Sequence, residues 1–134
     1  MRTIAKAAVL AATALGVLAA PAVGAREKLT GEEKLAKMLE GRVAGEGRSC
    51  IDTFASRNMK VIDGTAVVFR DGRTLWVNVP RNPEDLDDDD VWVTRQFGTQ
   101  LCRLDQVTTH DRGGMFFNGI VMLGDFVPYR KAES

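Results

Sequence analysis

The segment "TAVVFRDGRTLWVNVP", residues 65–80, restricts the fold more than any other part of the chain. Two apolar runs, rich in β-branched and aromatic residues, flank the dipeptide Asp71-Gly72. This dipeptide is typical of a two-residue hairpin turn, because both of its positions tolerate positive φ. We therefore predict a β-hairpin in which Arg70 pairs with Arg73 on either side of the turn.

Both faces of the predicted hairpin carry apolar side chains, which alternate from one face to the other along each strand. The first face holds Ala66, Val68, Leu75, Val77 and Val79. The second face holds Val67, Phe69 and Trp76. A strand that is apolar on both sides lies between two packed layers or in the wall of a barrel.

Further strands are predicted downstream of the hairpin. Apolar and polar residues alternate over 91–97 and 100–110, and the apolar segment 115–129 closes the chain after a turn at 111–114. Several short strands at regular spacing favour a mainly β fold, namely a small antiparallel barrel or sandwich.

One N-terminal helix is predicted ahead of the strands. Thr30 can cap it, Glu33 completes a capping box, and Gly41 stands where it ends. The glycine-rich stretch "GRVAGEGRS", residues 41–49, then reads as a connector.

The first 25 residues have the three parts of a secretory signal peptide. Arg2 and Lys6 are basic, residues 7–20 form an apolar run of fourteen, and small residues at 23–25 suit cleavage. The run is shorter than the roughly 20 residues that span a bilayer. We expect an exported protein, periplasmic or secreted, with no lipid anchor because the first cysteine is Cys50.

The predicted organisation therefore has three parts. Residues 1–25 form the signal peptide, residues 26–48 the helix and connector, and residues 49–134 the β-rich domain. Removal of Arg2 and Lys6 leaves 16 basic against 18 acidic residues. This near-neutral balance argues against nucleic acid as a partner, since nucleic acid calls for a clustered basic excess.

The chain has two cysteines, Cys50 and Cys102. In an oxidising compartment an even pair most often forms a disulfide. The bond would close a long loop, stabilise the fold by about 4 kcal/mol in the chain-entropy model and remove both thiols as nucleophiles.

The acidic run "EDLDDDD", residues 84–90, is the strongest local anomaly. Its candidate cation ligands are Asp85, Asp87, Asp88, Asp89 and Asp90. A calcium hand counted from Asp85 needs Gly at the sixth position and Glu at the twelfth, where this chain has Asp90 and Gln96. The run is therefore interpreted as a hydrated turn that guards a strand edge, with a looser Ca²⁺ site as the alternative.

Trp76 and Trp92 lie on the more polar face of their strands, and Asn78 shares the face of Trp76. Aromatic rings beside polar groups can form a stacking platform for a sugar, a peptide or a partner loop. The alternative is that this face packs under the N-terminal helix.

No catalytic residue is predicted. His110 is the single histidine, and neither Ser49 nor Ser56 sits in a G-x-S-x-G elbow. Carboxylates are numerous, but nothing in the sequence marks two of them as the pair that glycoside hydrolysis needs.

Several segments in order resemble a family of small exported proteins of Gram-negative bacteria that is catalogued as a domain of unknown function. These segments are "SCIDTF", "VIDGTAVVFR", "LWVNVP", "LDDDDVWVTRQFGTQLC" and "LGDFVPYRK". The resemblance covers Gly41 to Lys131 and implies export and a compact β-rich domain. It implies no catalytic or binding residues.

The sequence thus favours a non-catalytic binding or interaction module for an envelope component or another exported protein. The alternatives are a calcium-stabilised domain that uses the loop 84–90, and a carboxylate-based periplasmic hydrolase. No cofactor is expected apart from the Ca²⁺ of the first alternative.

Overall fold

The computed structural model describes Gly16 and residues 27–133. Apart from Gly16, the predicted signal peptide lies outside the described residues. The helices are α1 (Gly31–Met38), α2 (Thr53–Ser56) and the 3₁₀ turn η1 (Pro83–Asp85). The strands are β1 (Arg42–Ala44), β2 (Cys50–Asp52), β3 (Met59–Ile62), β4 (Ala66–Asp71), β5 (Thr74–Asn78), β6 (Val91–Arg95), β7 (Gln100–Cys102), β8 (Gln106–His110), β9 (Phe117–Val121) and β10 (Phe126–Lys131).

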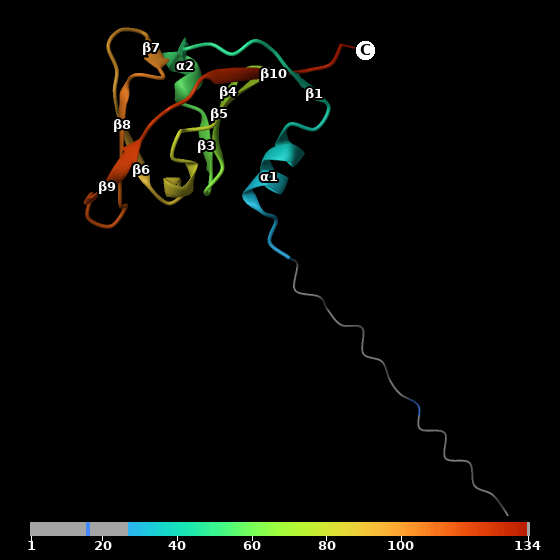
Figure 1. Ribbon diagram of the computed structural model, residues 1–134, viewed down its shortest axis with the longest axis horizontal. Helices are drawn as coiled ribbons and strands as arrows, with labels where there is room; N and C mark the ends of the chain where they lie inside the picture. Colours follow the sequence, from blue (N-terminus) through green and yellow to red (C-terminus); the bar gives the residue numbers. More distant parts are fainter. Residues whose placement is uncertain (1–15, 17–26, 134) are drawn as a thin grey trace, which may run out of the picture.

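The strands form three separate antiparallel sheets rather than a closed barrel. A five-stranded sheet has the order β1-β10-β5-β4-β3, a two-stranded sheet joins β2 to β7, and a three-stranded sheet has the order β6-β8-β9. The prediction of a mainly β, antiparallel fold is confirmed, and that of a barrel is wrong. The two smaller sheets lie on one side of the large sheet, and α1 lies on the other (Figure 1).

The β4–β5 hairpin forms, but its turn lies one residue later than predicted. Asp71 pairs with Thr74, which leaves Gly72 and Arg73 as the two central residues. Gly72 has φ of 55°, and Arg73 is outside the positive-φ region. A two-residue turn of that kind requires glycine at its first central position, and this requirement fixes the register. Arg70 consequently pairs with Leu75 and not with Arg73.

This change shifts the partner of each residue by two positions along the opposite strand. Because side chains alternate between faces, every side chain stays on the face that was predicted. One face joins a core cluster of Ile62, Ala66, Val68, Leu75 and Val77, against which Leu35, Met38 and Leu39 of the α1 segment pack. The helix thus covers the wholly apolar face. The face that carries Trp76 packs against the smaller sheets, so the expectation that it lies under the N-terminal helix is wrong.

The second core cluster lies between the large sheet and the smaller sheets. Val67, Phe69 and Trp76 of the hairpin meet Ile51 of β2 and Leu101 of β7 there, together with residues of β8, β9 and β10. The rings of Phe69 and Phe126 lie 5.7 Å apart at a tilt of 60°, a geometry that aromatic pairs favour. Burial of this hairpin on both faces makes it the centre of the fold.

Helix α1 begins as predicted at a capping box. The Thr30 hydroxyl accepts a hydrogen bond from the Glu33 N–H, and the Glu33 carboxylate accepts one from the Thr30 N–H. The prediction of a single helix was incomplete, because Asp52 caps a second short helix, α2, after β2. The predicted connector 41–49 also contains a strand, since β1 pairs with β10 at the edge of the large sheet.

The Cys50–Cys102 disulfide is present and joins two residues that are directly paired across β2 and β7. Among the described residues, none of the helices is both long and apolar enough to cross a bilayer.

Candidate functional site

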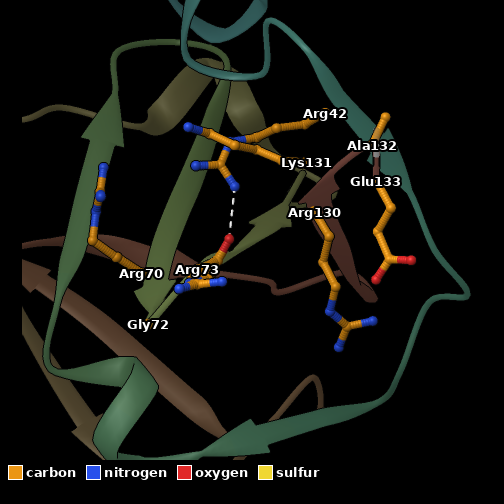
Figure 2. A pocket seen from close by; sticks show the side chains of 8 residues that line it. All are labelled: Arg42, Arg70, Gly72, Arg73, Arg130, Lys131, Ala132 and Glu133. Atoms are coloured by element: carbon orange, nitrogen blue, oxygen red, sulfur yellow. Dashed lines mark hydrogen bonds between the residues drawn. The ribbon is translucent and has the colours of Figure 1, made fainter.

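A basic cleft of about 860 Å³ lies at one end of the five-stranded sheet. Figure 2 shows the side chains that surround it. The lining residues are Arg42, Arg70, Gly72, Arg73, Arg130, Lys131, Ala132 and Glu133. We call this hollow the basic cleft.

The order of the strands explains why these residues meet. β10 lies between β1 and β5, and β5 pairs with β4, so the end of β10 lies beside the β4–β5 turn. Arg42 of β1 is paired with Lys131 of β10. Strand alternation places the side chains of Lys131 and Arg130 on opposite faces of the sheet. The basic cleft is therefore lined by cationic side chains from both faces, at the end of the sheet.

Hydrogen bonds hold two of the arginines in place. Arg42 donates from Nη1 to the carbonyl of Arg73 at 2.8 Å, the bond drawn in Figure 2, and to the carbonyl of Tyr129 at 3.4 Å. Arg130 donates from Nε to the Thr74 hydroxyl at 3.2 Å. Arg42 therefore fastens the β4–β5 turn to β10, and the Nη groups of Arg130 stay available.

Positive charge dominates the basic cleft. Five cationic side chains line it with one carboxylate, that of Glu133. Within the described part of the chain the ion pairs are Arg103–Asp125 and Arg112–Asp89, and neither lies in the cleft. Guanidinium groups that form no ion pair among the described residues present N–H donors that match the oxygens of a phosphate or carboxylate.

The acidic run lies elsewhere, and its carboxylates point in several directions. Asp85 accepts a hydrogen bond from the Asn82 amide at 3.0 Å, and Asp90 accepts one from the Asn118 amide at 2.7 Å. Asp89 pairs with Arg112 at 3.2 Å on an exposed surface. Three of the five predicted ligands are therefore engaged with separate local partners.

The other two, Asp87 and Asp88, meet a carboxylate that the sequence did not suggest. One oxygen from each of Asp63, Asp87 and Asp88 lies within 4.8 Å of the others, and all three residues are exposed. Asp63 lies in the turn before β4, whereas Arg70 lies near the far end of that strand and Arg73 in the turn that follows it. The acidic triad and the basic cleft are thus at opposite ends of β4.

The residues named for a stacking platform, Trp76, Trp92 and Asn78, lie in or against the core. Trp76 is 6% exposed and belongs to the core. Trp92 is half-buried and packs against the same core. Asn78 is fully buried, and its side-chain amide bonds both the carbonyl and the N–H of Gly124, at 2.7 and 2.9 Å. Asn78 therefore anchors the connection between β9 and β10 and is closed to a ligand.

His110 also has a local role. One ring nitrogen lies 3.0 Å from the Thr108 hydroxyl and the other 3.1 Å from the Met115 carbonyl. The hydroxyl of Ser56 donates to the carbonyl of Thr53. Ser56 is thus bonded to a backbone carbonyl and not to His110.

Exposed apolar side chains gather on the β8–β9 hairpin and the segment that follows it. They are Met115, Phe116, Phe117, Ile120 and Met122, with Phe116 73% exposed. The sequence predicted strands in this segment, but composition alone does not reveal which side of a strand is covered.

The sequence did not suggest the basic cleft either. Its cations come from three separate segments, around residues 42, 70–73 and 130–131, and the total charge of the chain is near zero. The available signal was that each segment carries arginine at a strand end. These arginines can be recognised as parts of one site only once the strand order is known.

Comparisons with known proteins add no relative: no family model, curated protein or solved structure matches this chain. The resemblance to a family of exported proteins therefore stays a prediction.

Proposed function

We propose that this chain is an exported, non-catalytic binding module that recognises anionic groups in the basic cleft. The observation that carries the proposal is the set of five cationic side chains, free of ion pairs within the described residues, around one open hollow. The disulfide supports export, because such bonds persist in oxidising compartments. A phosphate or carboxylate of an envelope component is a suitable ligand.

The composition of the basic cleft supports binding over hydrolysis. Glycoside hydrolysis needs two carboxylates on either side of the scissile bond, and among the described residues Glu133 alone brings a carboxylate to the cleft. Asp85 and Asp90 do share a smaller hollow of about 200 Å³, but the Asn82 and Asn118 amides hold them.

The proposal predicts that inorganic pyrophosphate binds to the purified chain and that Arg70→Gln and Arg130→Gln each weaken the binding about tenfold. This factor corresponds to about 1.4 kcal/mol, the loss expected for a charge-assisted hydrogen bond. Affinity should also fall as salt is added, because mobile ions screen exposed charges. Isothermal titration calorimetry at two salt concentrations measures both effects.

Arg95→Gln is the matched control, since it removes the same charge from β6, outside the basic cleft. It should leave the affinity close to that of the parent chain. Equal losses for the control and the cleft variants would show only a general effect of net charge and would remove the basis for this function.

A second candidate function, a calcium-stabilised domain, is favoured by the acidic triad Asp63, Asp87 and Asp88. Carboxylate oxygens are the ligands that Ca²⁺ prefers, and a divalent cation would relieve the repulsion among three like charges. At a Ca²⁺ concentration ten times Kd, binding stabilises the folded state by about 1.4 kcal/mol. The melting temperature should then rise by about 6–11 °C.

Differential scanning fluorimetry with Ca²⁺ up to the millimolar range tests this candidate. The double variant Asp87→Asn/Asp88→Asn should abolish the rise in melting temperature. The control Asp89→Asn/Asp90→Asn loses the same charge but leaves the triad intact, so it should keep the rise. A parent chain whose melting temperature does not respond to millimolar Ca²⁺ excludes the calcium function.

A further inference from the structure

A second hollow of about 380 Å³ adjoins the basic cleft and shares Arg130 with it. Its lining residues are Glu46, Gly47, Arg48, Pro128 and Arg130. Strand alternation places Pro128 and Arg130 on the same face of β10. Arg130 therefore stands where the basic cleft, at the end of the sheet, passes into this second hollow on one face.

The backbone explains why the second hollow exists. Ala44 pairs with Tyr129, and Arg48 forms a bridge with Phe126. The chain therefore advances four residues from Ala44 to Arg48, while β10 advances three residues between their partners, Phe126 and Tyr129. The segment beside β10 thus has one extra residue. An extra residue of this kind bends its segment away from the partner strand, as in a β-bulge. The Gly45 N–H still bonds the Pro128 carbonyl at 2.7 Å, so the extra residue falls at 46–47, and these two residues line the second hollow.

Arg48 is held at the far side of this space. Its N–H and carbonyl both bond to Phe126, each at 2.8 Å. Its guanidinium carbon lies 5.6 Å from the ring centre of Trp76, within the range of a cation–π contact. Arg48 forms no ion pair among the described residues. The second hollow therefore offers a positioned cation of the same kind as the basic cleft.

We propose that the two hollows form one groove, and that its ligand is a flexible linear polyanion with repeated phosphate or carboxylate groups. The inference rests on the proposed function and extends it from a single anionic group to a chain of them. One part of the ligand occupies the basic cleft, and the chain continues past Arg130 toward Arg48.

The lining residues indicate the class of polymer. In the described part of the chain no aromatic side chain lines either hollow, whereas single-stranded nucleic acid is bound largely by stacking of its bases on aromatic rings. Recognition here rests on charge and on the planar N–H groups of arginine. The groove also passes from the end of the sheet onto one face, so the ligand must bend.

Two carboxylates in the groove would repel an anionic ligand, and their substitution tests where the ligand lies. Glu133 lines the basic cleft, and Glu46 lines the second hollow. Removal of either charge should strengthen binding of a polyanion that lies nearby. Glu46→Gln should act only on ligands long enough to reach the second hollow.

The experiment compares pyrophosphate with linear polyphosphates of increasing length on the purified chain. Affinity should increase with length beyond pyrophosphate. Arg48→Gln should weaken the longest chains about tenfold and leave pyrophosphate unchanged, whereas Arg48→Lys should keep most of the affinity. Glu46→Gln should strengthen the longest chains at least twofold. Oligogalacturonates of increasing length, with the same variants, test whether carboxylates serve in place of phosphates.

The outcomes separate the two proposals. If Arg48→Gln leaves the longest phosphate and carboxylate chains unaffected, or weakens pyrophosphate equally, the groove is overturned and the basic cleft stands. If Arg70→Gln and Arg130→Gln do not weaken pyrophosphate, the proposed function itself fails. Tighter binding of a single-stranded oligodeoxynucleotide than of either polymer overturns the assigned class. Unfolding midpoints of all variants confirm that each one folds.

Discussion

At the scale of single residues, Asp111 organises the tip of the β8–β9 hairpin. One oxygen of its carboxylate accepts the N–H groups of Gly114 and Phe116, at 2.9 and 3.0 Å. These hydrogen bonds favour the charged form and lower the pKa of Asp111 below its usual value. The turn they close holds Met115 at φ of 58°, in the left-handed region that such side chains rarely adopt.

The lowered pKa predicts how this tip responds to acid. A carboxyl group whose pKa is depressed by folding stabilises the folded state above its unfolded pKa, about 3.9. That contribution is lost as the pH falls through the lower, folded pKa. The amide proton shifts of Gly114 and Phe116 should therefore titrate with a midpoint below 3.9, as measured by NMR.

Two substitutions check the assignment. Asp111→Ala removes the acceptor and should lower the melting temperature, whereas Asp111→Asn keeps an oxygen acceptor and should abolish only the titration of the two amides. A midpoint at or above the usual value for aspartate would contradict the role of these hydrogen bonds.

Asn78 shows where residue-level prediction failed. Its position beside Trp76 on a polar strand face suggested a ligand contact. The structure places its amide against Gly124, which is 46 residues away along the chain. A polar side chain looks the same in a sequence whether it meets a ligand or a distant backbone, so only the tertiary structure separates the two roles.

At the scale of elements, local signals predicted local structure well. The capping box of α1 was predictable because Thr30 and Glu33 are three residues apart and need no tertiary partner. The β4–β5 hairpin was predictable for the same reason. The phase of its turn was not, because Asp71-Gly72 and Gly72-Arg73 both satisfy the composition of a turn, and only the φ values distinguish them.

The β2–β7 sheet is the element that depends most on a covalent bond. Each strand has three residues, and Ile51 and Leu101 fix this small sheet to the core. The Cys50–Cys102 bond closes a separation of 52 residues, which stabilises the fold by about 4 kcal/mol in the chain-entropy model.

Reduction of this disulfide, or the double variant Cys50→Ala/Cys102→Ala, should lower the melting temperature by roughly 15 °C or more. Circular dichroism with and without a reductant measures the change. The reductant should have no further effect on the double variant. An unchanged melting temperature of the parent chain under full reduction would show that the sheet holds without the bond.

At the scale of the whole molecule, the two closing strands were more predictable than the sheets that they join. The apolar segment 115–129 was expected to form one or two strands, and it forms β9 and β10. These two strands join different sheets, because the connection at Leu123 and Gly124 turns into the core, where Asn78 fastens it. No local pattern encodes that choice, since it depends on which partners are already paired.

The basic cleft was beyond sequence reasoning for a related reason. β1 and β10 come from opposite ends of the described chain and are neighbours only in the folded sheet (Figure 1). A total charge near zero concealed the arginines, because it averages over regions that lie far apart in space.

The placement of the acidic triad and the basic cleft at opposite ends of β4 gives the molecule an electric dipole. β4 has six residues, so the two charged regions are separated by about 20 Å. This is more than the Debye length of about 8 Å at physiological ionic strength, and neither region cancels the field of the other in the water nearby. Close to a negatively charged surface, the molecule experiences a torque that turns the β4–β5 turn toward that surface before contact.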